Sequence, residues 1–172
     1  SSAVNRASKN NAYFLHIKPK KHNPNSDDIF MIGKAVVFDA GGMDLKTVNM
    51  VDMKTDMAGS ALIVAILNIL KRSAKNINLL IPIVENVIDG NATKPGTVIK
   101  TLNGITVEIT NTDAEGRLCI VDAIEYFNKF LNNKLKNPLL LDIATLTGNT
   151  SRISCGVSSV CTCNKKGKKY IN

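Results

Sequence analysis

The sequence predicts an α/β domain built on a mixed, largely parallel sheet with helices on both faces. Apolar runs of strand length alternate along the chain with longer stretches of helical periodicity, and this alternation is typical of strands joined by crossover helices. The chain has 172 residues, about one domain's worth, and 44% of them are hydrophobic. A composition of this kind supports a buried core.

The first half of the chain contains two strand patterns and one helix pattern. Aromatic and aliphatic residues at 13–17 and 30–38 predict strands, and a helix is expected from about residue 55 to 72. The apolar stretch 57–70 inside this helix is shorter than the roughly 20 residues that a membrane span needs. We therefore predict a buried helix there, and no membrane partner.

The second half begins with a continuous apolar run at 77–84, as expected for a strand buried on both faces. Strands at 98–101 and 105–110 flank Asn103-Gly104, which is a hairpin signal. An apolar stripe predicts a helix over 118–132, followed by strands at 139–146 and 157–163.

The segment 111–118 reads Asn-Thr-Asp-Ala-Glu-Gly-Arg-Leu, in a chain whose net charge is +8. Acidic residues that cluster in a chain of positive net charge often hold metal. On an extended backbone Asp113 and Glu115 would point to the same side, and so would Arg117, which is two residues further along. The alternative is a polar turn, because Asn, Thr, Asp and Gly favour local hydrogen bonding in loops. This segment alone leaves both open.

A second group of polar residues interrupts and follows the predicted strand 30–38. Lys34 lies inside the apolar run, and Asp39 closes it before Gly41-Gly42. A lysine in such a run is either an edge-strand residue that reaches solvent or a neutral amine bound to metal, since a nearby dication favours the deprotonated form.

Six blocks in order carry a resemblance to a known family. They read GKAVVFDAGG, then Lys46, then VDMKTDMAGSA, ENVIDGNATKPG, NTDAEGRL and DIATLTG. Over roughly residues 30–150 the chain resembles the leucyl (cytosol) aminopeptidases, which are two-metal exopeptidases, and NTDAEGRL is the signature of that family. The resemblance implies that peptides are the substrates and that an N-terminal leucine or a similar apolar residue is removed.

The resemblance implies a ligand set for two divalent ions, either zinc or manganese, with magnesium as a third candidate. Asp39 and Glu115 would bridge ions about 3–4 Å apart. Asp113 would complete the tighter site, and Lys34 and Asp56 the more exchangeable one. The stretch between Lys46 and Asp56 is one residue shorter than usual. Inside a helix that deletion would turn Asp56 by about 100° away from the metals.

Further residues match catalytic and substrate-binding positions of the family. Lys46 would polarise the scissile carbonyl, and Arg117 would hold a bicarbonate ion that acts as general base. The substrate pocket or the bound peptide would be contacted by Met53, Asn111, Thr145 and Gly148.

Domain organisation follows from the same resemblance. Residues 1–29 form an N-terminal segment with a first strand and a basic loop, 30–164 a partial aminopeptidase catalytic domain, and 165–172 a basic tail. Family members carry an additional N-terminal domain and a C-terminal third that closes the pocket and contributes to a hexamer. We therefore expect a homo-oligomer, and we keep as an alternative a truncated chain that folds and binds metal without turnover.

Other features exclude or weaken competing classes. The four cysteines lack Cys-x-x-Cys spacing, so a structural zinc site is not expected. Cys119 is predicted to lie in the core, and Cys161 and Cys163 leave a soft-metal site as a minor alternative.

Lysines gather at both ends of the chain, which leaves a basic nucleic-acid-binding module as another alternative. Eight aromatic residues and no tryptophan argue against it. The opening residues lack the apolar core of a signal peptide, so a cytoplasmic location is expected.

Overall fold

A five-stranded sheet lies at the centre of the computed structural model, which describes residues 1–70, 76–135, 137–148 and 159–170. The strands are β1 Tyr13–Ile17, β2 Ile29–Gly33, β3 Ala35–Asp39, β4 Ile77–Asn86 and β7 Leu139–Ile143, with β5 Thr97–Lys100 and β6 Thr106–Ile109 in a separate hairpin. The helices are α1 Ala58–Leu70 and α2 Glu115–Phe130, and the short 3-10 helices are η1 Val4–Ala7, η2 Met50–Thr55, η4 Thr112–Ala114, η5 Asn132–Lys134 and η6 Gly167–Tyr170.

Strand β4 organises the sheet. On one side it pairs antiparallel with β1, and on the other it pairs parallel with β2 along its first half and with β3 along its second half. Strand β2 also pairs parallel with β7. The sheet is therefore mixed and mostly parallel, as predicted, and Leu79 and Leu80 of β4 are fully buried.

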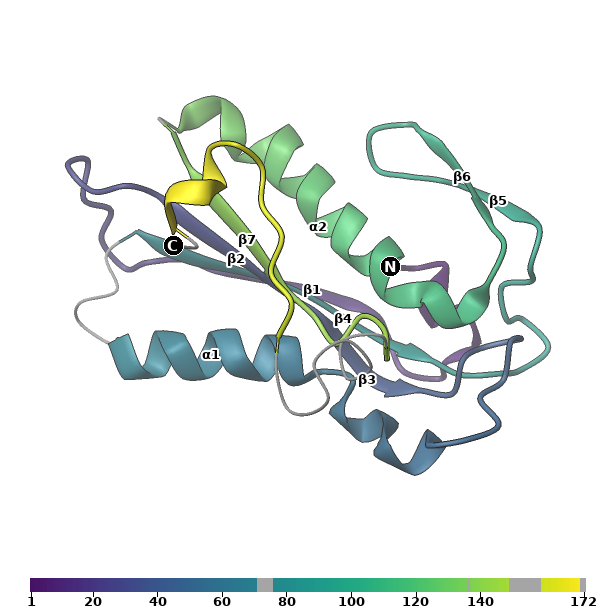
Figure 1. Ribbon diagram of the computed structural model, residues 1–172. Helices are drawn as coiled ribbons and strands as arrows, with labels where there is room; N and C mark the ends of the chain where they lie inside the picture. The colour runs from purple at the N-terminus through teal and green to yellow at the C-terminus, as the bar shows by residue number, and fades with distance from the viewer. Residues whose placement is uncertain (71–75, 136, 149–158, 171–172) are drawn as a thin grey trace.

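The two helices cover opposite faces of this sheet (Figure 1). Side chains alternate along a strand, so neighbouring residues of β4 point to different helices. Leu80 packs with Ile120 and Phe127 of α2, whereas Leu79 packs with Ile63 of α1. This arrangement confirms the helices predicted on both faces.

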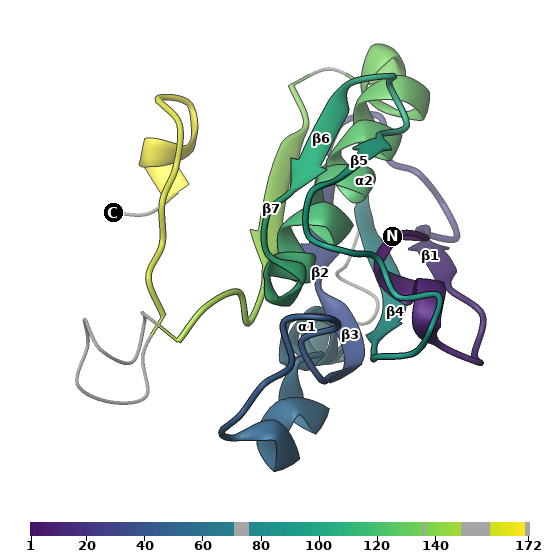
Figure 2. The same cartoon turned by 90° about the vertical axis from the view of Figure 1, so that its right-hand side faces the viewer.

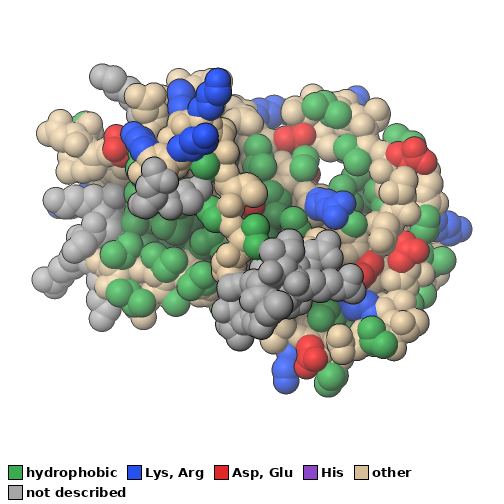
Figure 3. All heavy atoms as spheres, in the orientation of Figure 1, with side chains coloured by type: hydrophobic (Ala, Val, Ile, Leu, Met, Phe, Trp, Pro, Cys, Tyr) green, Lys and Arg blue, Asp and Glu red, His purple; other side chains and the backbone are tan. Residues whose placement is uncertain are grey.

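The prediction of a buried helix is wrong in part, because helix α1 has an exposed apolar outer side as well as a side buried at Gly59, Ser60 and Ile63. Leu62, Val64 and Ile69 are exposed, and Figure 3 shows hydrophobic side chains gathered over this helix. Taken together, Met50–Leu70 is long and apolar enough for a membrane span by length and composition. In the fold, however, this stretch is divided into η2 and the 13-residue α1.

The hairpin prediction is confirmed. Strands β5 and β6 pair antiparallel, and the turn is closed by the Thr101 N–H, which donates to the Ile105 carbonyl at 2.8 Å. Gly104 has a φ of +93°, a region that favours glycine. The hairpin lies beside α2 (Figure 2), and the Asn103 N–H donates to Glu125 at 3.2 Å.

The predicted single strand 30–38 is wrong in one respect, because it is interrupted at Lys34. The Lys34 N–H donates to the Ile143 carbonyl, and its own carbonyl accepts from the Ser60 N–H, both at 3.1 Å. These bonds direct the Lys34 backbone to the end of β7 and the start of α1. The interruption lies where the polar residues of the chain gather.

Other boundaries differ from the predicted ones. Helix α2 begins at Glu115, three residues before the predicted start at 118, and α1 begins at Ala58 after η2. Strand β7 ends at Ile143, because the next residues turn towards Lys34 and Asp56. Of the strand predicted at 157–163, the first two residues lie outside the described part, and 159–163 form no strand.

Candidate metal centre

Charged side chains converge at the carboxyl ends of the parallel strands, next to the first turn of α2. Ligand sites of open α/β sheets gather at this edge. Asp39 is the last residue of β3, and Glu115 is the first residue of α2. Both are 2% exposed, so the chain buries two acidic groups in one place.

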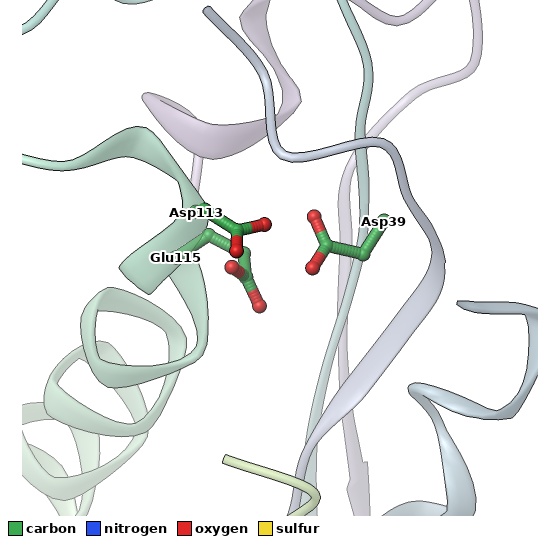
Figure 4. Close-up of side chains that lie close together, drawn as sticks. All are labelled: Asp39, Asp113 and Glu115. Carbon is green, nitrogen blue, oxygen red and sulfur yellow. The ribbon is translucent and has the colours of Figure 1, made fainter. Parts of the chain in front are cut away.

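Oxygens of Asp39, Asp113 and Glu115 lie within 4.8 Å of one another, and Figure 4 shows the three carboxylates turned towards a common space. The reason differs from the extended backbone that the sequence suggested. Residues 112–114 form η4, in which the Asn111 side chain accepts from the Asp113 N–H at 2.7 Å. A capped helical turn therefore brings Asp113 and Glu115 together.

Asp39 is held by three donors. Its Oδ1 accepts from the Gly41 N–H at 3.0 Å and from the Asn86 side-chain amide at 2.8 Å, and its Oδ2 lies 2.9 Å from Lys46 Nζ. Asn86 was missed as a site residue, although the polar pair Glu85-Asn86 after the apolar run 77–84 was the available signal. The amide of Asn86 also donates to the Thr112 carbonyl at 3.1 Å.

Thr112 and Asp44 are further residues that the sequence did not reveal. The Thr112 hydroxyl donates to the Gly41 carbonyl at 2.7 Å and accepts from the Asp44 N–H at 2.8 Å. In return, the Asp44 carboxylate accepts from the Thr112 N–H at 2.7 Å. These bonds fasten the loop after β3 to the segment before α2, so they fix how far apart Asp39 and Glu115 lie.

Lys34 is buried at the centre of the group. Its Nζ lies 2.8 Å from an oxygen of Asp56, 2.8 Å from one of Glu115 and 2.8 Å from the Thr145 carbonyl. The edge-strand alternative is therefore wrong. Burial alone would lower the pKa of Lys34, but Glu115 and Asp56 outweigh it and raise the pKa. Without metal, the side chain is an ammonium with three acceptors.

Asp56 lies at the end of η2 and faces the site despite the shortened spacing before it. Its Oδ1 accepts from Lys34 and from the Thr145 hydroxyl, each at 2.8 Å. Its Oδ2 is buried and has no hydrogen-bond partner among the residues that the structure describes. Burial raises the pKa of Asp56, although the hydrogen bond and the charge of Lys34 act to lower it.

Glu115 is the acid most strongly affected by its surroundings. Burial raises its pKa to about 7, although Lys34 acts to lower it, and the nearby Asp39 adds to the rise. Such a group binds a proton when no metal is present and would release it to a dication.

Gly116 explains why a glycine follows Glu115 in the signature. A Cβ at this position would lie 2.8 Å from Lys34 Cε and 2.9 Å from its Nζ. We expect Gly116→Ala to push the lysine out of its three contacts and to lower the free energy of unfolding by about 1–3 kcal/mol. Chemical denaturation of the metal-free chain would measure this loss. Gly90→Ala is the matched control, since a Cβ there meets nothing within 4 Å; equal losses in the two variants would contradict the packing argument.

The remaining predicted residues lie around this centre with fewer contacts to it. Met53 is half-buried in η2, and its carbonyl accepts from the Asp56 N–H at 3.2 Å. Arg117 is exposed in the first turn of α2, Asn111 is exposed at the cap of η4, and Gly148 is exposed. The structure thus brings together Lys34, Asp39, Lys46, Asp56, Asp113, Glu115 and Thr145.

The donor set fits divalent metal. Carboxylate oxygens are the ligands preferred by Mg²⁺ and Mn²⁺ and are accepted by Zn²⁺. Three carboxylates already converge, and the buried Oδ2 of Asp56 has no other partner in the described chain. The centre therefore has the composition of a metal site whose charge is balanced by two lysines when no ion is bound.

Comparison with known proteins gives one consistent result. The model of the catalytic domain of the cytosol aminopeptidase family matches residues 1–169. A probable cytosol aminopeptidase of Vesicomyosocius okutanii subsp. Calyptogena okutanii is 46% identical over 130 residues, covering 73% of this chain and 26% of that protein. One from Actinobacillus pleuropneumoniae serotype 5b is 41% identical over 150 residues, covering 85% and 29%.

Solved structures agree with the sequence matches. The leucine aminopeptidase of Caenorhabditis elegans superposes with a TM-score of 0.78 at 37% identity, covering 88% of this chain and 31% of that one. The bottromycin maturation enzyme BotP in complex with Mn superposes with a TM-score of 0.75 at 33% identity, covering 88% and 33%. The chain thus spans between a quarter and a third of the length of these relatives.

Proposed function

The chain belongs to the cytosol aminopeptidase family, and on that premise we propose that it removes N-terminal residues from peptides with the help of two divalent metal ions. The observation that carries the proposal is the convergence of Asp39, Asp113 and Glu115 beside the buried Lys34 and Asp56. A structural ion-pair cluster would leave no buried carboxylate oxygen without a partner, whereas Asp56 has one in the described chain.

Within this proposal, Asp39, Glu115, Asp113, Asp56 and Lys34 would hold the two ions, with Asp39 and Glu115 expected to contribute to both sites and Lys34 and Asp56 to the more exchangeable one. Zinc and manganese are the first candidates and magnesium the third; the similarity to BotP, which was solved in complex with Mn, supports manganese. The bound ions would act as Lewis acids towards a peptide carbonyl and lower the pKa of water.

The chain's own residues supply orientation and charge. The Lys46 ammonium, 16% exposed, lies at the solvent side of the carboxylates and would stabilise negative charge on the scissile carbonyl oxygen. Arg117, exposed two residues after Glu115, would hold a bicarbonate ion as general base. Met53, Asn111, Thr145 and Gly148 would contact the substrate, and an apolar pocket near Met53 would favour leucine.

A second candidate is a chain that folds and binds metal without hydrolysis. The observation in its favour is coverage, because the chain spans only 26–29% of the curated relatives above. Hydrolysis needs the substrate held in attack geometry as well as the ions, and misplacement costs rate steeply.

Steady-state assays on leucine amide separate the two candidates. With Mn²⁺ or Zn²⁺ present we expect release of leucine, and no reaction with N-acetyl-leucine amide, since a blocked amino group would not be recognised. Binding of metal without hydrolysis would support the second candidate. Absence of metal binding at millimolar concentrations would contradict both.

Metal binding is expected to strengthen as pH rises through about 7. The pKa of Glu115 is raised to about 7 from an ordinary value of 4.5, so below pH 7 a proton competes with the metal for this carboxylate. The same proton makes the metal-free chain more stable near pH 5 than near pH 8, because the folded state binds it more tightly than the unfolded state. Titrations at pH 5.5, 7 and 8.5 would show the trend; an affinity independent of pH would contradict it.

Location and assembly follow from the relatives. Because the matched proteins are named cytosol aminopeptidases, we propose a cytoplasmic location. The exposed apolar side of α1, including Leu62 and Ile69, supports a homo-oligomer.

A further inference from the structure

Lys46 occupies a position that metal would need. Its Nζ lies 2.9 Å from Asp39 Oδ2 and 2.5 Å from Asp113 Oδ1, and both carboxylates belong to the proposed ligand set. We infer that Lys46 is an internal cation that holds these carboxylates together in the metal-free chain and is displaced when metal binds, which frees it for the substrate. The inference rests on the proposed metal site. It adds that metal binding releases the Lys46 ammonium, which can then contact the substrate carbonyl.

The negative charges of Asp39, Asp113 and Glu115 need a nearby cation. Three carboxylates within 4.8 Å repel one another at low dielectric unless a cation lies between them. Lys34 balances Glu115 and Asp56, but within the described part of the chain it forms no ion pair with Asp39 or Asp113. Lys46 is the ammonium that serves this second pair.

The two carboxylate oxygens of Asp39 have different partners. Its Oδ1 accepts hydrogen bonds from the Gly41 N–H and the Asn86 amide. We call Gly41, Asn86, Thr112 and Asp44 the frame of the site, because their mutual bonds hold its segments together. Its Oδ2 contacts Lys46. A metal ion that uses the oxygen left free by the frame therefore has to replace this ammonium.

Lys34 and Lys46 differ in how firmly their side chains are held. Lys34 is 2% exposed, has three acceptors and is pressed against Gly116, so it cannot leave without unpacking the site. Lys46 is 16% exposed, and within the described part of the chain its Nζ pairs with the two carboxylates of Asp39 and Asp113 alone. Its side chain is the one that can turn out to water.

The backbone does not need to move for this displacement. The Lys46 N–H donates to the Ala40 carbonyl at 2.9 Å, and Asp44 is bonded to Thr112 through both its N–H and its carboxylate. Rotation within the four-carbon stem is enough, and the ammonium keeps its proton throughout. Because its backbone stays in place, the ammonium would remain near the carboxylates, available to a substrate carbonyl.

Metal affinity of Lys46→Met tests the inference without any measurement of activity. Removing the competing cation is expected to tighten Mn²⁺ binding at least about tenfold, the scale of one charge-assisted hydrogen bond. Lys54→Met is the matched control, because Lys54 is exposed in η2 and has no recorded ion pair in the described chain. Calorimetric titration of metal-free protein would give both constants. Affinity unchanged or weakened in Lys46→Met, with circular dichroism as in the unsubstituted chain, would overturn the inference.

Amine labelling of the unsubstituted chain gives a second readout that needs no variant. If metal displaces Lys46, acylation of Lys46 should become faster when Mn²⁺ is added, relative to acylation of Lys54 in the same sample. Peptide mass spectrometry would measure the ratio. Metal binding without any change in the ratio would overturn the displacement, whereas failure of the chain to bind Mn²⁺ at all would instead contradict the proposed function.

Discussion

Replacing Asp39 or Glu115 with alanine is expected to reduce bound metal from near two ions per chain to near zero, and to abolish hydrolysis. Each carboxylate is proposed to be shared between the ions, so its loss opens both coordination spheres. Asp39 also accepts hydrogen bonds from the Gly41 N–H and the Asn86 amide, so its removal breaks these two bonds as well.

Metal content after dialysis, measured by atomic emission, would check this result. Asp142→Ala serves as control, because Asp142 is an exposed acid in β7 that is not one of the three clustered carboxylates. One ion retained by both Asp39→Ala and Glu115→Ala would show that the two carboxylates do not bridge.

Lys46→Ala is expected to lower the rate of leucine amide hydrolysis by about 10²-fold or more at saturating metal, while leaving the ions in place. The physical reason is that an ammonium beside the carbonyl stabilises charge that develops only in the transition state. Arg117→Ala should have an effect of similar size, since one positioned general base is worth about 10²–10⁴ in rate.

Lys54→Ala is the control for Lys46, and its rate should match that of the unsubstituted chain. The informative comparison is between rate and metal content in the same sample. A variant that loses metal in proportion to its rate would identify the altered residue as a ligand or a structural residue.

Much of the fold could be predicted because its signals are local. The apolar run in β4, the stripe on α2 and the Asn103-Gly104 turn each specify an element from neighbouring residues alone. The interruption at Lys34 could not be predicted in this way. It depends on bonds to Ile143 and Ser60, which come from distant parts of the chain.

The candidate site shows the same division. The acids of the signature and Lys34 were singled out by type and by charge contrast, and the structure gathers them. Of the two alternatives left open for 113–117, the extended backbone does not occur, because the Asn111 cap and the start of α2 make a helical turn there. Asn86, Thr112 and Asp44 could not be identified as frame residues, since polar residues at loop ends are common and only their mutual bonds reveal the role.

The shortened spacing before Asp56 also needed the structure. In a continuous helix a missing residue would have turned this side chain away. The residues after β3 instead form a loop, and η2 begins only at Met50, so Lys46 and Asp56 are not joined by one continuous helix. Asp56 consequently remains 2.8 Å from Lys34.

Electron paramagnetic resonance of the chain titrated with Mn²⁺ tests the central claim most directly. If Asp39 and Glu115 bridge two ions about 3–4 Å apart, the spectrum at two equivalents should be that of a spin-coupled pair, and Asp39→Ala should remove it. A spectrum of isolated Mn²⁺ at every ratio, or of free aqueous Mn²⁺ alone, would contradict a two-metal centre at these carboxylates.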